Sequence, residues 1–286
     1  MKFYTGSRKI TPEFPVLQCG YAARTKKSKG IHDDTYASVV LLQENETVVF
    51  ITLDVSYGDK SFSHGIKTSI GEKFEIPSEN IIISYTHTHS SVAITGEVVS
   101  MRNRRPYSLA SDRFFFHGEW EDIDDSKDLE YYRHIKKQIM DMMKEGMNNL
   151  MEGHIYLNKS SSKLGISRRL PIDDHIELRP YDNDDAMDMD LFVLKLSDNS
   201  GKLKGIIYNY ACHPTSASYD NYLISSDIIG VVRTQLKNKY PGTEVVFLQG
   251  CGADVKPRFG AVDGYFKSAS FERMKKGCQP FIREII

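Results

Sequence analysis

The apolar positions of the chain gather into short runs of strand length, separated by stretches with helical spacing. Residues 36–42 and 47–55 are rich in β-branched and aliphatic side chains and flank a polar four-residue turn, which predicts a hairpin. Similar runs predict further strands at 81–85, 154–157, 190–196, 205–210 and 243–248.

Helices are predicted between several of these strands. Residues 61–74 are amphipathic, residues 128–150 show the clearest helical spacing, and Asp227 is placed to cap a helix extending to about residue 239. Residues around 100–127 have no periodicity, which predicts an irregular insertion. The alternation of strands and helices favours the α/β class, as one sandwich-like domain over residues 1–286 with a mostly buried mixed sheet and flanking helices.

Composition narrows the classes of partner. Hydrophobic residues make up 40% of the chain, enough for a large core, and the formal net charge is -1 with both signs mixed throughout. No basic face predicts nucleic acid as a partner, and no apolar run reaches the roughly 20 residues of an integral membrane segment. The first residues lack the apolar core of a signal peptide, so a cytoplasmic protein is predicted. The four cysteines form no CxxC pair and are expected to be buried or free thiols.

Residues suited to catalysis or metal binding recur where predicted strands end. Asp54, His87 with His89, His213 and Asp254 each follow an apolar run. In open α/β sheets the loops at the strand ends converge on one crevice, so these side chains are expected to share a site.

The segment His87-Thr88-His89 offers two imidazoles separated by one residue. On an extended backbone they would face the same side, as two metal ligands or as one ligand beside an acid–base group. His213 precedes Pro214, which keeps it extended at its strand end. A nitrogen-rich site favours zinc, which in catalytic sites keeps three protein ligands. The alternative is a threonine-rich strand with hydrogen-bonded histidines.

The remaining candidates are less specific. Asp54 and Asp254 are the first carboxylates to test as a third ligand. The small residues of the loop 250–257 allow close approach of a substrate, although a tight turn without a function explains them equally well, and the loop is no P-loop. The arginines at 102, 104 and 105 could hold an anionic substrate or belong to a solvated basic loop.

With these motifs identified, the chain resembles the N-terminal catalytic domain of the neutral/alkaline ceramidases. The matching pieces extend over nearly the whole chain in a specific order and spacing. They are Gly20-Tyr21-Ala22, Gly30-Ile31-His32-Asp33, Val48-Val49-Phe50-Ile51-Thr52-Leu53-Asp54, Thr86-His87-Thr88-His89-Ser90, Asn209-Tyr210-Ala211-Cys212-His213-Pro214-Thr215, Leu223-Ile224-Ser225-Ser226-Asp227 and Val245-Val246-Phe247-Leu248-Gln249-Gly250.

The resemblance implies zinc as the cofactor and hydrolysis of an N-acyl amide bond. It implies that His87 and His213 bind the zinc, and that His89 lies beside the metal and stabilises the reacting carbonyl. Two departures stand out. Lys256 occupies the position of the family's catalytic serine, and the family's glutamate and tyrosine ligands would come from downstream of residue 286. The substrate is therefore expected to be an amide other than ceramide.

The resulting hypothesis is a zinc-dependent amidase acting on a small molecule. Zinc on His87 and His213 would activate a water for attack on the carbonyl. His89 would donate to the oxyanion with Asp254 as an acidic partner, while Arg104 and Lys256 would bind the substrate. Two alternatives stay open: a non-catalytic relative that binds a metal or a small ligand, and a magnesium or manganese hydrolase of an anionic substrate. A homo-oligomer that completes the metal site between subunits is a further expectation.

Overall fold

A computed structural model describes residues 1–286 except 22, 25 and 95–124. Its main feature is an eight-stranded mixed sheet in the order β15-β13-β12-β8-β1-β3-β4-β6. One half contains β1 (Lys2–Lys9), β3 (Tyr36–Gln43), β4 (Thr47–Leu53) and β6 (Ile81–Tyr85). The other half contains β8 (Met151–Ser161), β12 (Asp190–Asp198), β13 (Leu203–Tyr210) and β15 (Glu244–Gln249).

The two halves of the sheet meet at a short seam and pack face to face. Only two residue pairs join β1 to β8, Lys2 with Glu152 and Phe3 with Met151. Beyond the seam, the Thr52 hydroxyl donates to the Phe247 carbonyl at 2.8 Å, from one half-sheet to the other. A buried cluster between the halves contains Phe3, Val40, Leu196, Ile207 and Val246.

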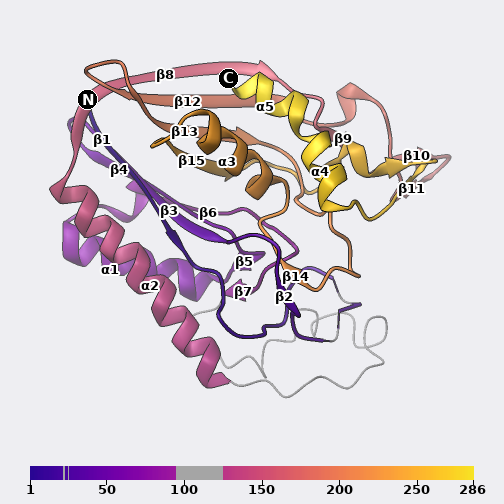
Figure 1. Cartoon of the computed structure of the whole chain (residues 1–286), viewed down its shortest axis with the longest axis horizontal. Helices are drawn as coiled ribbons and strands as arrows, with labels where there is room; N and C mark the ends of the chain where they lie inside the picture. The colour runs from indigo at the N-terminus through magenta and orange to yellow at the C-terminus, as the bar shows by residue number, and fades with distance from the viewer. Residues whose placement is uncertain (22, 25, 95–124) are drawn as a thin grey trace.

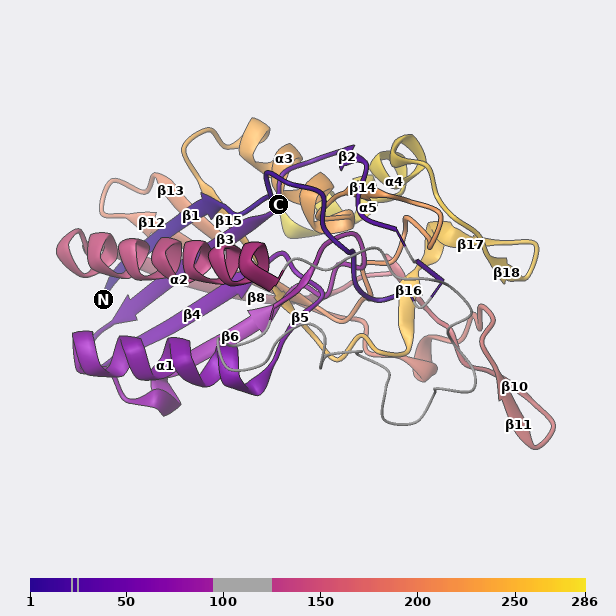
Figure 2. The same cartoon turned by 90° about the horizontal axis from the view of Figure 1, so that it is seen from below.

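Helices cover the outer face of each half-sheet, which gives four layers (Figures 1 and 2). On the first half lie α1 (Lys60–Phe74) and α2 (Asp125–Asn148); on the second lie α3 (Ile228–Lys239), α4 (Phe271–Gly277) and α5 (Gln279–Ile285). Each outer interface has its own apolar cluster. Inner strands are therefore apolar on both faces, as in β3, where Ala37–Leu41 are all buried.

Each half repeats the same order of elements. Three antiparallel strands are followed by a helix and a fourth strand that runs parallel to the third. The parallel pairs are β4 with β6 and β13 with β15. Because parallel strands end at the same edge, the loops that follow these four strands are brought to one end of the sandwich.

Short strands and turns complete the described chain. They are β2 (Gly30–Ile31), β5 (Tyr57–Gly58), β7 (Ala93–Ile94), β9 (Gly165–Ser167), β10 (Leu170–Ile172), β11 (His175–Glu177), β14 (Leu223–Ile224), β16 (Val255–Pro257), β17 (Ala261–Val262) and β18 (Tyr265–Phe266). None of the helices in the described part of the chain combines the length and apolar character that a membrane span requires.

The predicted α/β sandwich is confirmed, with its mixed sheet and flanking helices. The predicted hairpin, the strand at 81–85 and the helix capped by Asp227 are present. β1, α4 and α5 were not predicted from the sequence. Of the irregular insertion predicted at 100–127, residues 125–127 begin α2 and residues 100–124 lie outside the described chain.

Candidate metal centre

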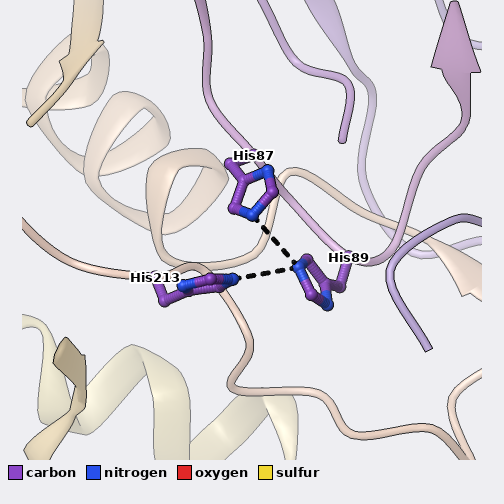
Figure 3. Close-up of side chains that lie close together, drawn as sticks. All are labelled: His87, His89 and His213. Atoms are coloured by element: carbon purple, nitrogen blue, oxygen red, sulfur yellow. Dashed lines mark hydrogen bonds between the residues drawn. The ribbon is translucent and has the colours of Figure 1, made fainter. Parts of the chain in front are cut away.

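Three histidines from both halves of the sandwich converge at the end where the parallel strands finish (Figure 3). His87 and His89 follow β6, and His213 follows β13. His87 is half-buried and the other two are buried. The fold thus brings together side chains that are more than 120 residues apart in the sequence.

The facing nitrogens are as close as ligands around one metal ion. Nε2 of His89 lies 3.4 Å from Nε2 of His87 and 3.0 Å from Nε2 of His213. Two nitrogens bound tetrahedrally to zinc at about 2.0–2.1 Å would be about 3.3–3.4 Å apart. The ligand nitrogens of all three histidines lie within 4.8 Å of one another, so the group could hold a metal ion, and imidazole donors suit zinc.

The backbone at His87 differs from the prediction. The sequence predicted an extended His-Thr-His segment, but His87 has φ 63°, in the left-handed region that non-glycine residues seldom adopt. The segment turns here because the His87 N–H donates to Val55 at 3.0 Å, while the His89 N–H donates to Pro214 at 3.3 Å. The two imidazoles converge through this turn and not through strand alternation.

The second ring nitrogens distinguish His89 from its neighbours. Nδ1 of His87 lies 2.6 Å from the Ser56 carbonyl, and Nδ1 of His213 lies 3.2 Å from the Gly252 carbonyl. A carbonyl only accepts, so these Nδ1 atoms carry the protons and both Nε2 atoms present lone pairs, as metal-binding histidines do. Nδ1 of His89 is buried and has no partner among the described residues. Its Nε2 is the ring nitrogen that contacts the other two histidines.

Burial keeps two of the imidazoles neutral. It lowers the pKa of His89 to about 2 and that of His213 to about 3, assisted by the neighbouring imidazoles and by positive charges including Lys256. Metal binding requires neutral imidazole, and these two histidines meet that requirement at physiological pH.

A buried carboxylate holds the loop that carries His213. Asp227 accepts hydrogen bonds from the N–H and hydroxyl of Ser216, at 3.0 and 2.6 Å, and from the N–H of Ala217 at 3.2 Å. It also caps α3 through the N–H of Ile228 at 2.8 Å. The same residue thus fixes both the helix and the histidine loop.

Asp54, one of the two carboxylates predicted as a third ligand, has a structural role instead. It is fully buried, pairs with Arg233 at 2.6 Å and accepts from the Ser226 hydroxyl at 2.9 Å. It stands outside the group of described residues that could hold a metal. A strand-end position alone could not separate a ligand from a buried ion pair.

The other predicted site residues are placed as follows. Asp254 is half-buried and also stands outside that histidine group, while Lys256 is half-buried in β16, which follows the same loop. Arg104, with Arg102 and Arg105, lies outside the described residues.

A segment for which no role was predicted packs against His89. Gly20 approaches so closely that a Cβ atom there would collide with the imidazole. The ring of Tyr21 meets it edge-on at 4.9 Å between centroids, and buried Arg24 donates to the His89 carbonyl. In the sequence, this segment could have been found only through the Gly20-Tyr21-Ala22 motif. That motif is one of the pieces that match the family, but no function was predicted for it.

With this geometry established, comparisons with known proteins show that the chain is similar to ceramidases. Residues 5–114 match the sequence model of the family described as neutral/alkaline non-lysosomal ceramidase, N-terminal. The neutral ceramidases of Drosophila pseudoobscura pseudoobscura and Drosophila melanogaster are each 23% identical over 255 residues, covering 84% of this chain and 32% of the relative. The chain thus spans about a third of the length of these curated relatives.

Solved structures agree on the fold. The neutral ceramidase from Pseudomonas aeruginosa superposes with a TM-score of 0.75 at 19% identity, covering 99% of this chain and 44% of that protein. A ceramidase complexed with C2 gives the same TM-score at 18% identity, with 99% and 43% covered. The resemblance predicted from the motifs is confirmed: this chain is similar in sequence to the neutral/alkaline non-lysosomal ceramidases and has a fold similar to the two solved ceramidase structures.

Proposed function

We propose that this protein is a zinc-dependent hydrolase that cleaves an N-acyl amide bond in a small molecule other than ceramide. The observation that carries the proposal is the convergence of three imidazoles with Nε2 separations of 3.0 and 3.4 Å. The relationship to ceramidases supports amide cleavage, and Lys256 at the family's serine position supports a different substrate.

His87 and His213 are the proposed zinc ligands because their Nδ1 atoms face carbonyls and their Nε2 lone pairs face the cluster. Bound zinc would act as a Lewis acid and lower the pKa of a water. His89 is proposed as the hydrogen-bond donor, because its Nδ1 has no partner among the described residues and an Nε2–H group would stabilise negative charge on the carbonyl oxygen.

In the reaction a water adds to the amide carbon, the C–N bond breaks, and the released amine takes up a proton. Asp254 remains the proposed acidic partner for this proton transfer. The loop of residues 250–257 holds His213 in place, since the His213 N–H donates to Val255 at 2.9 Å. The cytoplasmic location and the homo-oligomeric state also remain predictions. The four cysteines of the chain form no disulfide bonds with one another.

Three single substitutions test the roles of the histidines. His87→Ala and His213→Ala should each lose stoichiometric zinc, while His89→Ala should keep zinc and hydrolyse N-acyl amides about a hundredfold more slowly or worse, as expected on losing an oxyanion donor. Zinc is measured by elemental analysis and turnover by release of the free acid. His64→Ala, an exposed histidine on α1, is the control and should change neither quantity.

Metal exchange separates the amidase from the two alternatives. Metal-free protein should recover amide hydrolysis with zinc. Zinc uptake without hydrolysis of any amide, ester or phosphoester would indicate a non-catalytic metal-binding relative. Hydrolysis of phosphoesters supported by magnesium or manganese would instead indicate the anionic-substrate hydrolase, and the proposed zinc amidase would be wrong.

A further inference from the structure

Two cationic side chains lie on one small β-ribbon beside the histidines. The ribbon pairs β9 with β16, placing Lys256 opposite Ile166, and the Arg168 N–H donates to the Asp254 carbonyl at 2.7 Å. Residues opposite each other in an antiparallel pair point to the same side, as do residues two apart along one strand. Lys256 and Arg168 are therefore diagonal neighbours on one face of the ribbon.

The ribbon is tied directly to the proposed metal site. The His213 N–H donates to the carbonyl of Val255, the residue before Lys256, at 2.9 Å. The charge of Lys256 lowers the pKa of both His89 and His213, and the charge of Arg168 lowers that of His213. Both cations are thus within electrostatic reach of the cluster.

Lys256 is half-buried and forms no ion pair among the described residues; burial lowers its pKa, and the charge of Asp227 offsets this only in part. Among the described residues it has no ion pair or side-chain hydrogen bond, and its ammonium lies over the ring of Phe266, 4.9 Å from the centroid. Exposed Lys163, by contrast, pairs with Asp184 at 2.6 Å. Asp254 lies across from Arg168 on the same face of the ribbon, so its carboxylate offsets one of the two positive charges and leaves one in excess. Figure 2 shows β16 next to β17 and β18, the hairpin that carries Phe266.

An unpaired cation is costly to bury, and a divalent metal bound by neutral imidazoles would add further positive charge beside it. The arrangement becomes more favourable when an anion binds to Lys256. The planar guanidinium of Arg168 can bind a carboxylate through two parallel hydrogen bonds, and the compact ammonium of Lys256 adds a second positive charge.

We propose that Lys256 and Arg168 form an anion subsite, and that the substrate is an N-acyl compound with a carboxylate within a few bonds of the amide that is cleaved. The choice of substrate class rests on the proposed amidase function. The anion subsite itself does not, because it depends only on the ribbon and its two cations.

Matched substrates test the preference for charge. The zinc-loaded protein should cleave an N-acylglycine or an N-succinyl amide with a higher kcat/KM than the neutral N-acylethanolamine or N-butyryl amide of equal size. In Lys256→Met and Arg168→Gln this ratio of charged to neutral should fall about 10- to 100-fold, the value of one charge-assisted hydrogen bond. Lys202→Met and Arg169→Gln remove the same charges at exposed positions and should leave the ratio unchanged.

A binding measurement keeps the two proposals distinguishable. Calorimetric titration of N-acetylglycine into metal-free protein, which does not turn over, should show binding that weakens about tenfold or more in Lys256→Met. If this loss occurs but no amide is hydrolysed with zinc, the subsite stands and the amidase proposal fails. If binding is absent or equal in both proteins, or if neither charged substrate is preferred, the anion subsite is overturned.

Discussion

The three histidines differ in the contacts of their second ring nitrogen, and this difference assigns their roles. His87 and His213 donate from Nδ1 to backbone carbonyls, whereas Nδ1 of His89 has no acceptor among the described residues. The sequence could identify all three as candidates from their positions after strands. It could not reveal the tautomers, because the acceptor carbonyls come from Ser56 and Gly252, which no local pattern connects to them.

The depressed pKa values of His89 and His213 predict how the metal-free protein responds to acid. The unfolded chain binds protons on both residues below about pH 6.5, while the folded chain does not until about pH 2–3. Stability should therefore be full above pH 6.5 and decrease as the pH falls, by at most about 1.4 kcal/mol per pH unit for each group.

Urea unfolding between pH 7.5 and 5 measures this slope. His89→Gln, which cannot titrate, should show a shallower dependence than the wild type. Equal slopes for the two proteins would mean that His89 is not held neutral by the fold.

Gly20 shows how a residue without reactive groups can matter at the site. A methyl group at this position would overlap the His89 imidazole, and the backbone there has φ 100°. Gly20→Ala should slow amide hydrolysis about 10- to 100-fold by displacing His89, with zinc retained because His87 and His213 keep their contacts.

The matched control for this prediction is Gly201→Ala. Gly201 has a similar positive φ of 81° but no atom within 4 Å of an added Cβ. It isolates backbone strain from the collision, so an equal loss of activity in both variants would exclude displacement of His89 as the cause.

At the scale of elements, apolar runs in the sequence predicted the strands whose central residues are buried. β3, β4, β13 and β15 were found because their runs of aliphatic residues are continuous. β1 was not predicted as a strand because only Phe3 and Tyr4 are buried, while Lys2, Arg8 and Lys9 are exposed. Its place beside β3 is set by partners in the sheet, which a local pattern cannot show.

The start of α3 links helix capping to the metal site. Removing Asp227 deprives α3 of its N-cap and leaves the N–H groups of Ser216 and Ala217 buried without an acceptor. Asp227→Ala should lower the free energy of unfolding by about 2–4 kcal/mol and weaken zinc affinity by loosening the His213 loop. Asp227→Asn, which retains one acceptor oxygen, should be affected less.

Ser270→Ala removes the N-cap of α4, where the side chain accepts from the Arg273 N–H at 3.2 Å, and serves as the control. It should cost about 1 kcal/mol in urea unfolding and leave zinc affinity, measured by competition with a chelator, unchanged. If Asp227→Ala lowered stability alone, with normal zinc affinity, Asp227 would have no positioning role.

At the scale of the whole molecule, the site depends on two half-sheets that are joined by only two residue pairs at the seam. Each half repeats three antiparallel strands, a helix and a parallel strand, and contributes a histidine loop from a different strand of that repeat. The sequence predicted the α/β sandwich and the meeting of strand ends. It could not predict the face-to-face packing, because the residues of that interface look like those of any buried strand.

The central claim is that these two halves hold one zinc ion between His87 and His213. A crystal of the zinc-loaded protein, measured on both sides of the zinc absorption edge, tests it most directly. The account predicts a single anomalous peak within bonding distance of Nε2 of both histidines, about 2.0–2.1 Å. A protein that takes up zinc but shows the peak elsewhere, or shows none between these two side chains, would contradict it.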